Sequence, residues 1–160
     1  MRGRRNLEAI SDLLRLASAF RKAIQDAIYN GDIQEINMKD FPTGCCTYAS
    51  DLLQRFLADH GVFTWSMAGV YRNGQEFESH AWLETQDGTV IDITGDQYKH
   101  KALCFSVPVY VGTREDGFHN QFELYTPTPY RVDDDPFGRN REFNERYDAV
   151  MRHLRIHEVR

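Results

Sequence analysis

The sequence has few cysteines. There are three, and two of them, Cys45 and Cys46, are adjacent. One adjacent pair and one remote cysteine lack the spacing of a small secreted domain stapled by disulfides. Thiols that stay reduced are typical of the cytosol, so we expect a cytoplasmic protein.

The sequence also lacks a long apolar run. The basic stretch Met1–Arg5 is followed by a segment in which charged residues recur every few positions. That segment has neither the apolar centre of a signal peptide nor the length of a membrane span. We therefore expect no membrane partner.

Positive charge is not in excess either. The chain has 24 acidic and 19 basic residues, which gives a net charge of −5. A negative chain does not favour binding to a phosphate backbone, so we do not expect a nucleic-acid partner. A glycine-rich phosphate loop and a dinucleotide fingerprint are both missing from the sequence, and we expect no cofactor.

What the sequence does contain is a set of periodic segments of a size suited to one domain. At 160 residues and 41% hydrophobic composition, residues 1–160 are expected to form a single domain with one core. Apolar residues recur at helical spacing over 6–30 and from Cys45 or Cys46 to about His60. The expected strands are 62–72, 75–85, 89–94, 103–111 and 122–125, and a last helix is expected at 141–156.

This order predicts an α+β fold, with N-terminal helices packed on an antiparallel sheet of about four to five strands and a C-terminal helix. Asn73-Gly74 predicts a hairpin between the first two strands. Pro108 predicts an edge position or a bulge in the fourth strand, and Cys104 is expected in the core. Residues 126–140 are expected to form an exposed connector with an acidic run, Asp133–Asp135.

The turn Phe41–Gly44 delivers Cys45 and Cys46 to the start of a helix. Unpaired N–H groups and the macrodipole stabilise negative charge there, which lowers the pKa of a thiol. Helical phase does not separate the two cysteines, so both are candidate nucleophiles at this point.

A thiolate of this kind needs a base and a group that orients the base, and His80 and Asp92 lie on adjacent expected strands. If Gln86–Gly88 forms a three-residue loop, Trp82 faces Asp92. His80 and Asp92 then become diagonal neighbours on one face, roughly 5.5 to 8 Å apart at the backbone. A two-residue loop would turn Asp92 away from His80, so the three-residue loop is a prediction on which the pairing depends.

A thiol that opens a helix, then His-Ala-Trp-Leu-Glu (His80–Glu84), then Ile-Asp-Ile-Thr (Ile91–Thr94), resembles the transglutaminase-like branch of the papain-like cysteine enzymes over roughly residues 41–98. The resemblance implies a papain-like core at about 41–125. It implies an enzyme in which Cys46 attacks an acyl carbonyl, with Cys45 as the small residue before it, while His80 shuttles the proton and Asp92 orients it.

Members of that superfamily include thiol proteases, deamidases and crosslinking transglutaminases. The expected function is therefore a cysteine hydrolase or acyltransferase, and the expected substrate is a peptide or protein. Thr47 stands where papain-like enzymes have an aromatic residue, and a glutamine just upstream is missing. The N–H of Cys46 can supply one oxyanion donor, and Gln97 is a candidate for the second. Trp82 is expected to shield the site.

Other interpretations remain open. The chain could be an inactive papain-like domain that binds a partner protein, and Asp96 could replace Asp92 as the orienting group. His153 and His157 are four residues apart and could share a metal. A zinc site could also use Cys45, Cys46, His80 and Asp92, but adjacent cysteines chelate one ion poorly, so no metal is expected. The oligomeric state is not indicated.

Overall fold

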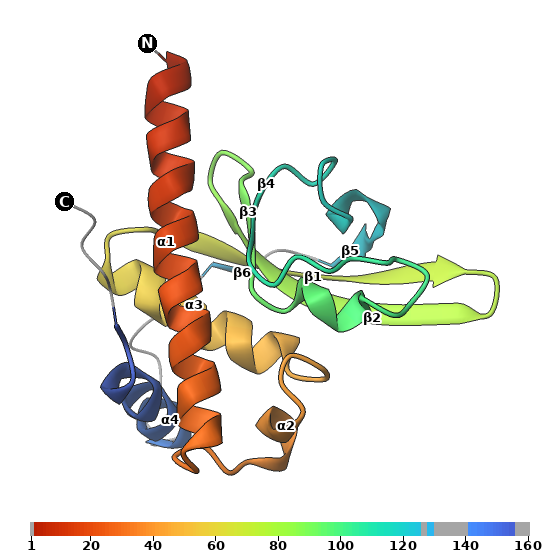
Figure 1. Ribbon diagram of the computed structural model, residues 1–160. Helices are drawn as coiled ribbons and strands as arrows, with labels where there is room; N and C mark the ends of the chain where they lie inside the picture. The colour runs from red at the N-terminus through yellow and green to blue at the C-terminus, as the bar shows by residue number, and fades with distance from the viewer. Residues whose placement is uncertain (1, 126–127, 130–140, 156–160) are drawn as a thin grey trace.

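The computed structural model describes the backbone of residues 2–125, 128–129 and 141–155, and the side chains of residues 8–125 and 141–155. Helices α1, α3 and α4 gather on one side of a sheet, and the far end of the β1–β2 hairpin extends beyond them (Figure 1). The elements in chain order are α1 (Arg2–Tyr29), α2 (Ile36–Lys39), α3 (Cys46–Asp59), β1 (Thr64–Asn73), β2 (Glu76–Thr85), β3 (Val90–Asp92), the short 3₁₀ helix η1 (Gly95–Tyr98), β4 (Tyr110–Gly112), the 3₁₀ helix η2 (His119–Gln121), β5 (Glu123–Leu124), β6 (Thr128–Pro129) and α4 (Arg141–Arg152).

The three long helices form because each has an apolar stripe at helical spacing. On α1, Phe20 and Ile24 are fully buried, and Phe20 stacks on Phe56 of α3 with ring centroids 4.7 Å apart. On α4, Tyr147 and Val150 are buried in the same core. All three helices lie where the periodicity predicted them.

The sheet is antiparallel, with strand order β4-β3-β2-β1-β5 and with β6 also paired to β1. The predicted hairpin is confirmed, because Asn73 pairs with Glu76. Its two loop residues are Gly74 and Gln75, and Gly74 has φ +63, which a glycine tolerates at the first position of a tight turn. The α+β class, the antiparallel sheet and the C-terminal helix are thus confirmed.

The register between β2 and β3 is the one that the three-residue loop predicted. Leu83 pairs with Ile91, and the N–H of Thr85 donates to the carbonyl of Thr89 at 2.9 Å. Between them Gly88 has φ +87, the left-handed conformation that this loop needs at its third residue. Continued by one residue, the pairing places Trp82 opposite Asp92.

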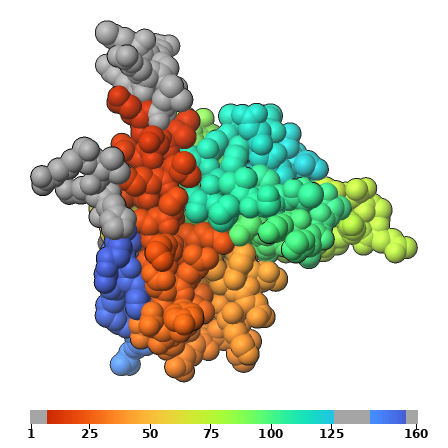
Figure 2. Space-filling view, in the orientation of Figure 1, coloured from red at the N-terminus to blue at the C-terminus, as the bar shows by residue number. Residues whose placement is uncertain are grey.

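The two faces of the sheet bury different cores. One face carries Leu83 and Ile91 against α1, α3 and α4. The other carries an aromatic cluster that includes Trp82, Tyr98 and Phe118, and the chain from about residue 95 to 122 covers it. Figure 2 shows this segment as a continuous mass beside α1. His80, Trp82 and Glu84 of β2 are therefore buried in an aromatic, covered layer.

The predicted strand at 103–111 is wrong over most of its length, because only Tyr110–Gly112 pairs in the sheet. Cys104 has φ +49 and is exposed, which also corrects its expected place in the core. Pro108 has no N–H for a ladder, and its carbonyl accepts instead from Arg21 at 2.7 Å. A side chain of α1 thus fixes a segment that the sequence pattern assigned to a strand.

Within the expected connector at 126–140, Thr128–Pro129 forms β6, while the acidic run Asp133–Asp135 lies outside the described residues. Among the described helices, none combines the length and apolar character that a membrane crossing requires.

Candidate functional site

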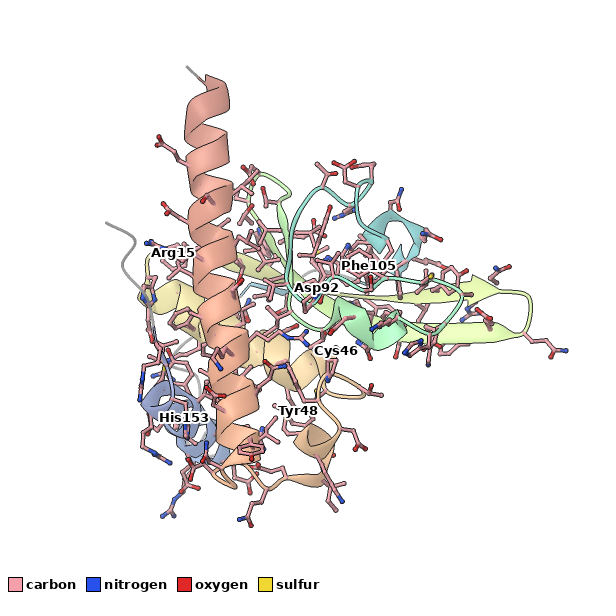
Figure 3. The ribbon with its side chains drawn as sticks, in the orientation of Figure 1. Arg15, Cys46, Tyr48, Asp92, Phe105 and His153 are labelled. Carbon is pink, nitrogen blue, oxygen red and sulfur yellow. The ribbon has the colours of Figure 1, made fainter. Side chains whose placement is uncertain are left out.

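Cys46 is the first residue of α3. The turn before it contains Gly44 with φ +74, which redirects the chain into the helix. The first N–H groups of a helix have no intrahelical acceptor, so the N–H of Cys46 is oriented toward an incoming anion or carbonyl oxygen. Cys46 is half-buried, and Figure 3 places it close to Asp92, between the start of α3 and the sheet.

The start of α3 meets the sheet where β3 stops. The β2–β3 ladder ends near Leu83, so the next part of the β2 edge is free to contact the helix. The hydroxyl of Ser50 donates to the carbonyl of Ala81 at 3.4 Å, and the main chain of Ala81 is one of the groups that lower the pKa of Cys46. A short β3 is therefore what allows the thiol to approach β2.

His80 and Asp92 form a buried pair on the covered face of the sheet. Nε2 of His80 lies 2.7 Å from Oδ2 of Asp92, and both side chains are almost fully excluded from solvent. The other oxygen of Asp92, Oδ1, accepts the N–H of Thr94 at 2.9 Å. Such a bond, in which an aspartate accepts the N–H of the second residue after it, is typical of a turn. Here it lies at the end of β3 and holds the Asp92 carboxylate in place.

The opposite charges of this pair raise the pKa of His80 and lower the pKa of Asp92. Burial alone would lower the pKa of His80, but the charge and hydrogen bond of Asp92, with help from Cys46, raise it to about 9. Burial alone would raise the pKa of Asp92, but His80 and His119 hold it well below its usual range. The site therefore favours an imidazolium beside a carboxylate at neutral pH.

The pKa values of the two adjacent cysteines are also shifted in opposite directions. Burial would raise the pKa of Cys46, but the hydrogen bond and charge of His80, the N–H of Ala81 and the hydroxyl of Thr47 outweigh it and lower that pKa. Cys45 is fully buried with its sulfur 3.3 Å from the carbonyl of Pro42. Burial, followed by the charge of Cys46, raises the pKa of Cys45 to about 12. Only Cys46 joins the His80–Asp92 pair.

Gln97, on η1, also reaches the site. Its Nε2 lies 3.1 Å from Nδ1 of His80, the ring nitrogen opposite to the one that contacts Asp92. Nδ1 can accept the amide N–H only in the neutral ring, because both ring nitrogens of an imidazolium are donors. The candidate oxyanion donor is thus beside the thiol–imidazole pair.

Trp82 packs against His80 as expected, with ring centroids 5.7 Å apart and an interplanar angle of 26°. Its Nε1 donates to Glu84 at 2.8 Å, and Glu84 pairs with Arg114 through Nε and a terminal nitrogen. Glu84 is buried rather than at the surface. The motif residues His80, Trp82 and Glu84 therefore share one face of β2 and are fixed in a row.

The sequence patterns missed a second histidine on Asp92. Nε2 of His119, on η2, lies 2.7 Å from the same Oδ2 that His80 contacts, and His119 is fully buried. It sits in an irregular segment without helical or alternating periodicity, so no local signal marks it. The candidate cluster is therefore Cys46, His80, Asp92 and His119, with Gln97 at its edge.

The donor atoms of His80, Asp92 and His119 lie close enough together to suggest a metal. However, two tetrahedral zinc ligands at about 2.1 Å from the metal stand roughly 3.3 Å apart. The 2.7 Å separations in the cluster are hydrogen-bond distances instead.

The remaining alternatives do not gather at the site either. Asp96 is engaged by Arg21 through both carboxylate oxygens, so it does not orient His80. His153 contacts Asp32 at 2.5 Å, and His157 lies outside the described residues.

Comparisons of the chain with protein-family models, curated proteins and solved structures found no match. The geometry and electrostatics of the cluster therefore carry the functional argument alone.

Proposed function

We propose that this protein is a cysteine-dependent acyl-transfer enzyme of the transglutaminase-like type, with Cys46 as nucleophile, His80 as general base and acid, and Asp92 as the orienting group. The observation that carries the proposal is the buried 2.7 Å contact between His80 and Asp92, on a ring whose hydrogen bond and charge also lower the pKa of Cys46. That arrangement supplies a thiolate–imidazolium pair near neutral pH.

In the first half of the reaction, the Cys46 thiolate attacks the acyl carbonyl and forms a carbon–sulfur bond. The electron pair moves to the carbonyl oxygen, which the N–H of Cys46 stabilises at the start of α3. His80 then donates its Nδ1 proton to the leaving amine, and the carbon–nitrogen bond breaks. The product is an acyl-enzyme on Cys46.

In the second half, the neutral His80 takes a proton from the second nucleophile as that nucleophile attacks the thioester. The carbon–sulfur bond then breaks, which releases the acyl product and returns the Cys46 thiolate beside the His80 imidazolium. Water gives hydrolysis or deamidation, and an amine gives transfer. Asp92 keeps Nε2 protonated throughout, so Nδ1 is the nitrogen that gains and loses the proton. The carboxylate stays ionised because its two histidine donors hold its pKa low.

Gln97 supplies the second oxyanion donor in this scheme. Its amide Nε2 lies 3.1 Å from Nδ1 of His80. In the thiolate–imidazolium pair Nδ1 already carries a proton and does not accept a hydrogen bond. The amide N–H is therefore available to the substrate oxygen, beside the N–H of Cys46, when negative charge develops there.

The accessibility of the cluster favours a peptide or protein substrate. His80 and Asp92 are enclosed, whereas Cys46 is half-buried at the end of a helix. A carbonyl carried on an extended chain can reach the sulfur without entering the aromatic layer. We also propose that the start of α3, packed against the unpaired part of β2, corresponds to the papain-like core.

The experiment is acylation with nitrophenyl acetate, followed by acid quenching and mass mapping of the modified cysteine. We expect the acetyl group on Cys46, none in Cys46→Ala, and acylation slowed by about 10²-fold or more in His80→Ala. Cys45→Ala is the matched control and is expected to acylate like the native protein. Acylation that spreads to exposed Cys104 or ignores His80→Ala would favour a non-enzymatic binding domain instead.

A further inference from the structure

Resting on the proposed function, we infer that His119 is a positioning residue that holds the Asp92 carboxylate in the orientation His80 needs. Asp92 is the shared acceptor of two histidines, each with Nε2 2.7 Å from Oδ2. The hydrogen-bonding partner of Nε2 of His119 is Asp92 and not the thiol. His119 acts on the reaction through Asp92.

The hydrogen bonds of Asp92 explain why a second histidine matters. Oδ1 accepts the N–H of Thr94 at 2.9 Å, and Oδ2 accepts from both rings. Without His119, Oδ1 of the carboxylate would keep the N–H and, at 3.5 Å, the hydroxyl of the neighbouring Thr94, while Oδ2 would keep only the very ring that it has to orient. With His119, Oδ2 is fixed from outside the His80–Asp92 pair, so the carboxylate plane does not turn with the His80 ring.

The surroundings of His119 select the tautomer that makes this bond. Nδ1 of His119 is buried and has no hydrogen-bond partner among the described residues. A Cβ on Gly117 would lie 2.8 Å from that nitrogen, and the ring of Tyr110 stacks on His119 at 5.5 Å. A proton on Nδ1 would be a buried donor without an acceptor, so the proton belongs on Nε2, facing Asp92.

The segment that carries His119 is fixed to the same layer by a second contact. Arg114, five residues earlier, pairs with Glu84 at 2.8 Å, and Glu84 accepts from Trp82. The Trp82 ring touches both histidines, with centroids 5.7 Å from His80 and 4.9 Å from His119. The segment over the site thus supports the His80–Asp92 pair from two directions.

Two substitutions at one position separate positioning from packing. His119→Gln keeps an N–H donor for Asp92 but loses the stacked ring, whereas His119→Phe keeps a ring and loses the donor. The readout is the pKa of Cys46, taken from the pH dependence of alkylation by iodoacetamide. We expect His119→Gln to keep the low pKa of Cys46, and His119→Phe to raise that pKa and slow alkylation at neutral pH by about tenfold.

The reverse pattern, with His119→Phe like the native protein and His119→Gln impaired, would overturn the inference and leave a packing role. A native protein whose Cys46 has an ordinary pKa would instead refute the proposed function itself, so the two failures are distinguishable. A readout without substitutions is the tautomer of each histidine from ¹⁵N NMR of the native protein. We expect protons on both ring nitrogens of His80 and the Nε2–H tautomer on His119, and an Nδ1–H tautomer on His119 would refute the inference even if His119→Phe fails to fold.

Discussion

Replacement of Asp92 by asparagine removes the charge at the centre of the cluster and keeps the shape of the side chain. The Asp92 carboxylate accepts from His80, His119 and the N–H of Thr94. An asparagine amide has one acceptor oxygen and presents two donors of its own, so at least one buried N–H loses its acceptor. The substitution also ends the raised pKa of His80, because burial then acts without opposition.

The expected loss in the free energy of unfolding follows from the burial of the His80–Asp92 pair. Removing one partner of a buried charge pair costs about 3–5 kcal/mol in the free energy of unfolding, a large share of the roughly 5–15 kcal/mol of a typical domain. The pKa of His80, raised from 6.5 to about 9, corresponds to about 3 kcal/mol of interaction, which agrees with that range. We therefore expect Asp92→Asn to lower the free energy of unfolding by about 3–5 kcal/mol at neutral pH.

The assay is urea unfolding of both proteins at several pH values. The depressed pKa of Asp92 contributes stability that is present above its usual value of 3.8 and is lost as pH falls below it. Asparagine does not titrate in this pH range, so the difference in the free energy of unfolding between the two proteins should become smaller in acid. The control is Asp12→Asn, which removes an exposed carboxylate paired with Arg15 and should change stability by less than about 0.5 kcal/mol. Asp92→Asn within about 1 kcal/mol of the native protein would refute the reasoning.

Three further predictions concern the surroundings of the site. Arg21→Met should lower the free energy of unfolding in urea by about 3–5 kcal/mol, because buried Arg21 binds both carboxylate oxygens of Asp96. A decrease of less than about 1 kcal/mol would contradict a stabilising role for this contact. Gly69→Ala should cost about 1–3 kcal/mol, because its Cβ would lie 2.6 Å from the carbonyl oxygen of Glu123 in β5; unchanged amide exchange in β5 would be the contrary result. Cys45→Ser should leave the ultraviolet titration of the Cys46 thiolate unchanged, since the pKa of Cys45 is about 12; a lost low-pH thiolate signal would make Cys45 the reactive thiol.

Local chemistry was sufficient to predict the parts of the fold that pair His80 with Asp92. Gly88 in a left-handed conformation fixes the loop, and the loop fixes which residues of β2 and β3 share a face. The start of α3 was predicted to within one residue, at Cys45 or Cys46, from the turn residues before it and the apolar periodicity after it. These features depend on neighbours in the sequence, which is why patterns reveal them.

The parts that were missed depend on contacts between distant segments. Residues 103–109 resemble a strand by composition, but Arg21 of α1 holds their path by binding the carbonyl of Pro108. His119 reaches Asp92 across 27 residues from a segment without periodicity. No pattern in one sequence encodes such pairings.

The most direct test of the central claim is the pH dependence of iodoacetamide labelling of the native protein, resolved by mass mapping into the three cysteines. The lowered pKa of Cys46 predicts that this residue is labelled first and is already reactive at neutral pH, with reactivity lost as pH falls through that pKa. His80→Ala should remove this advantage. Labelling of Cys46 no faster than that of exposed Cys104 at neutral pH would contradict the account.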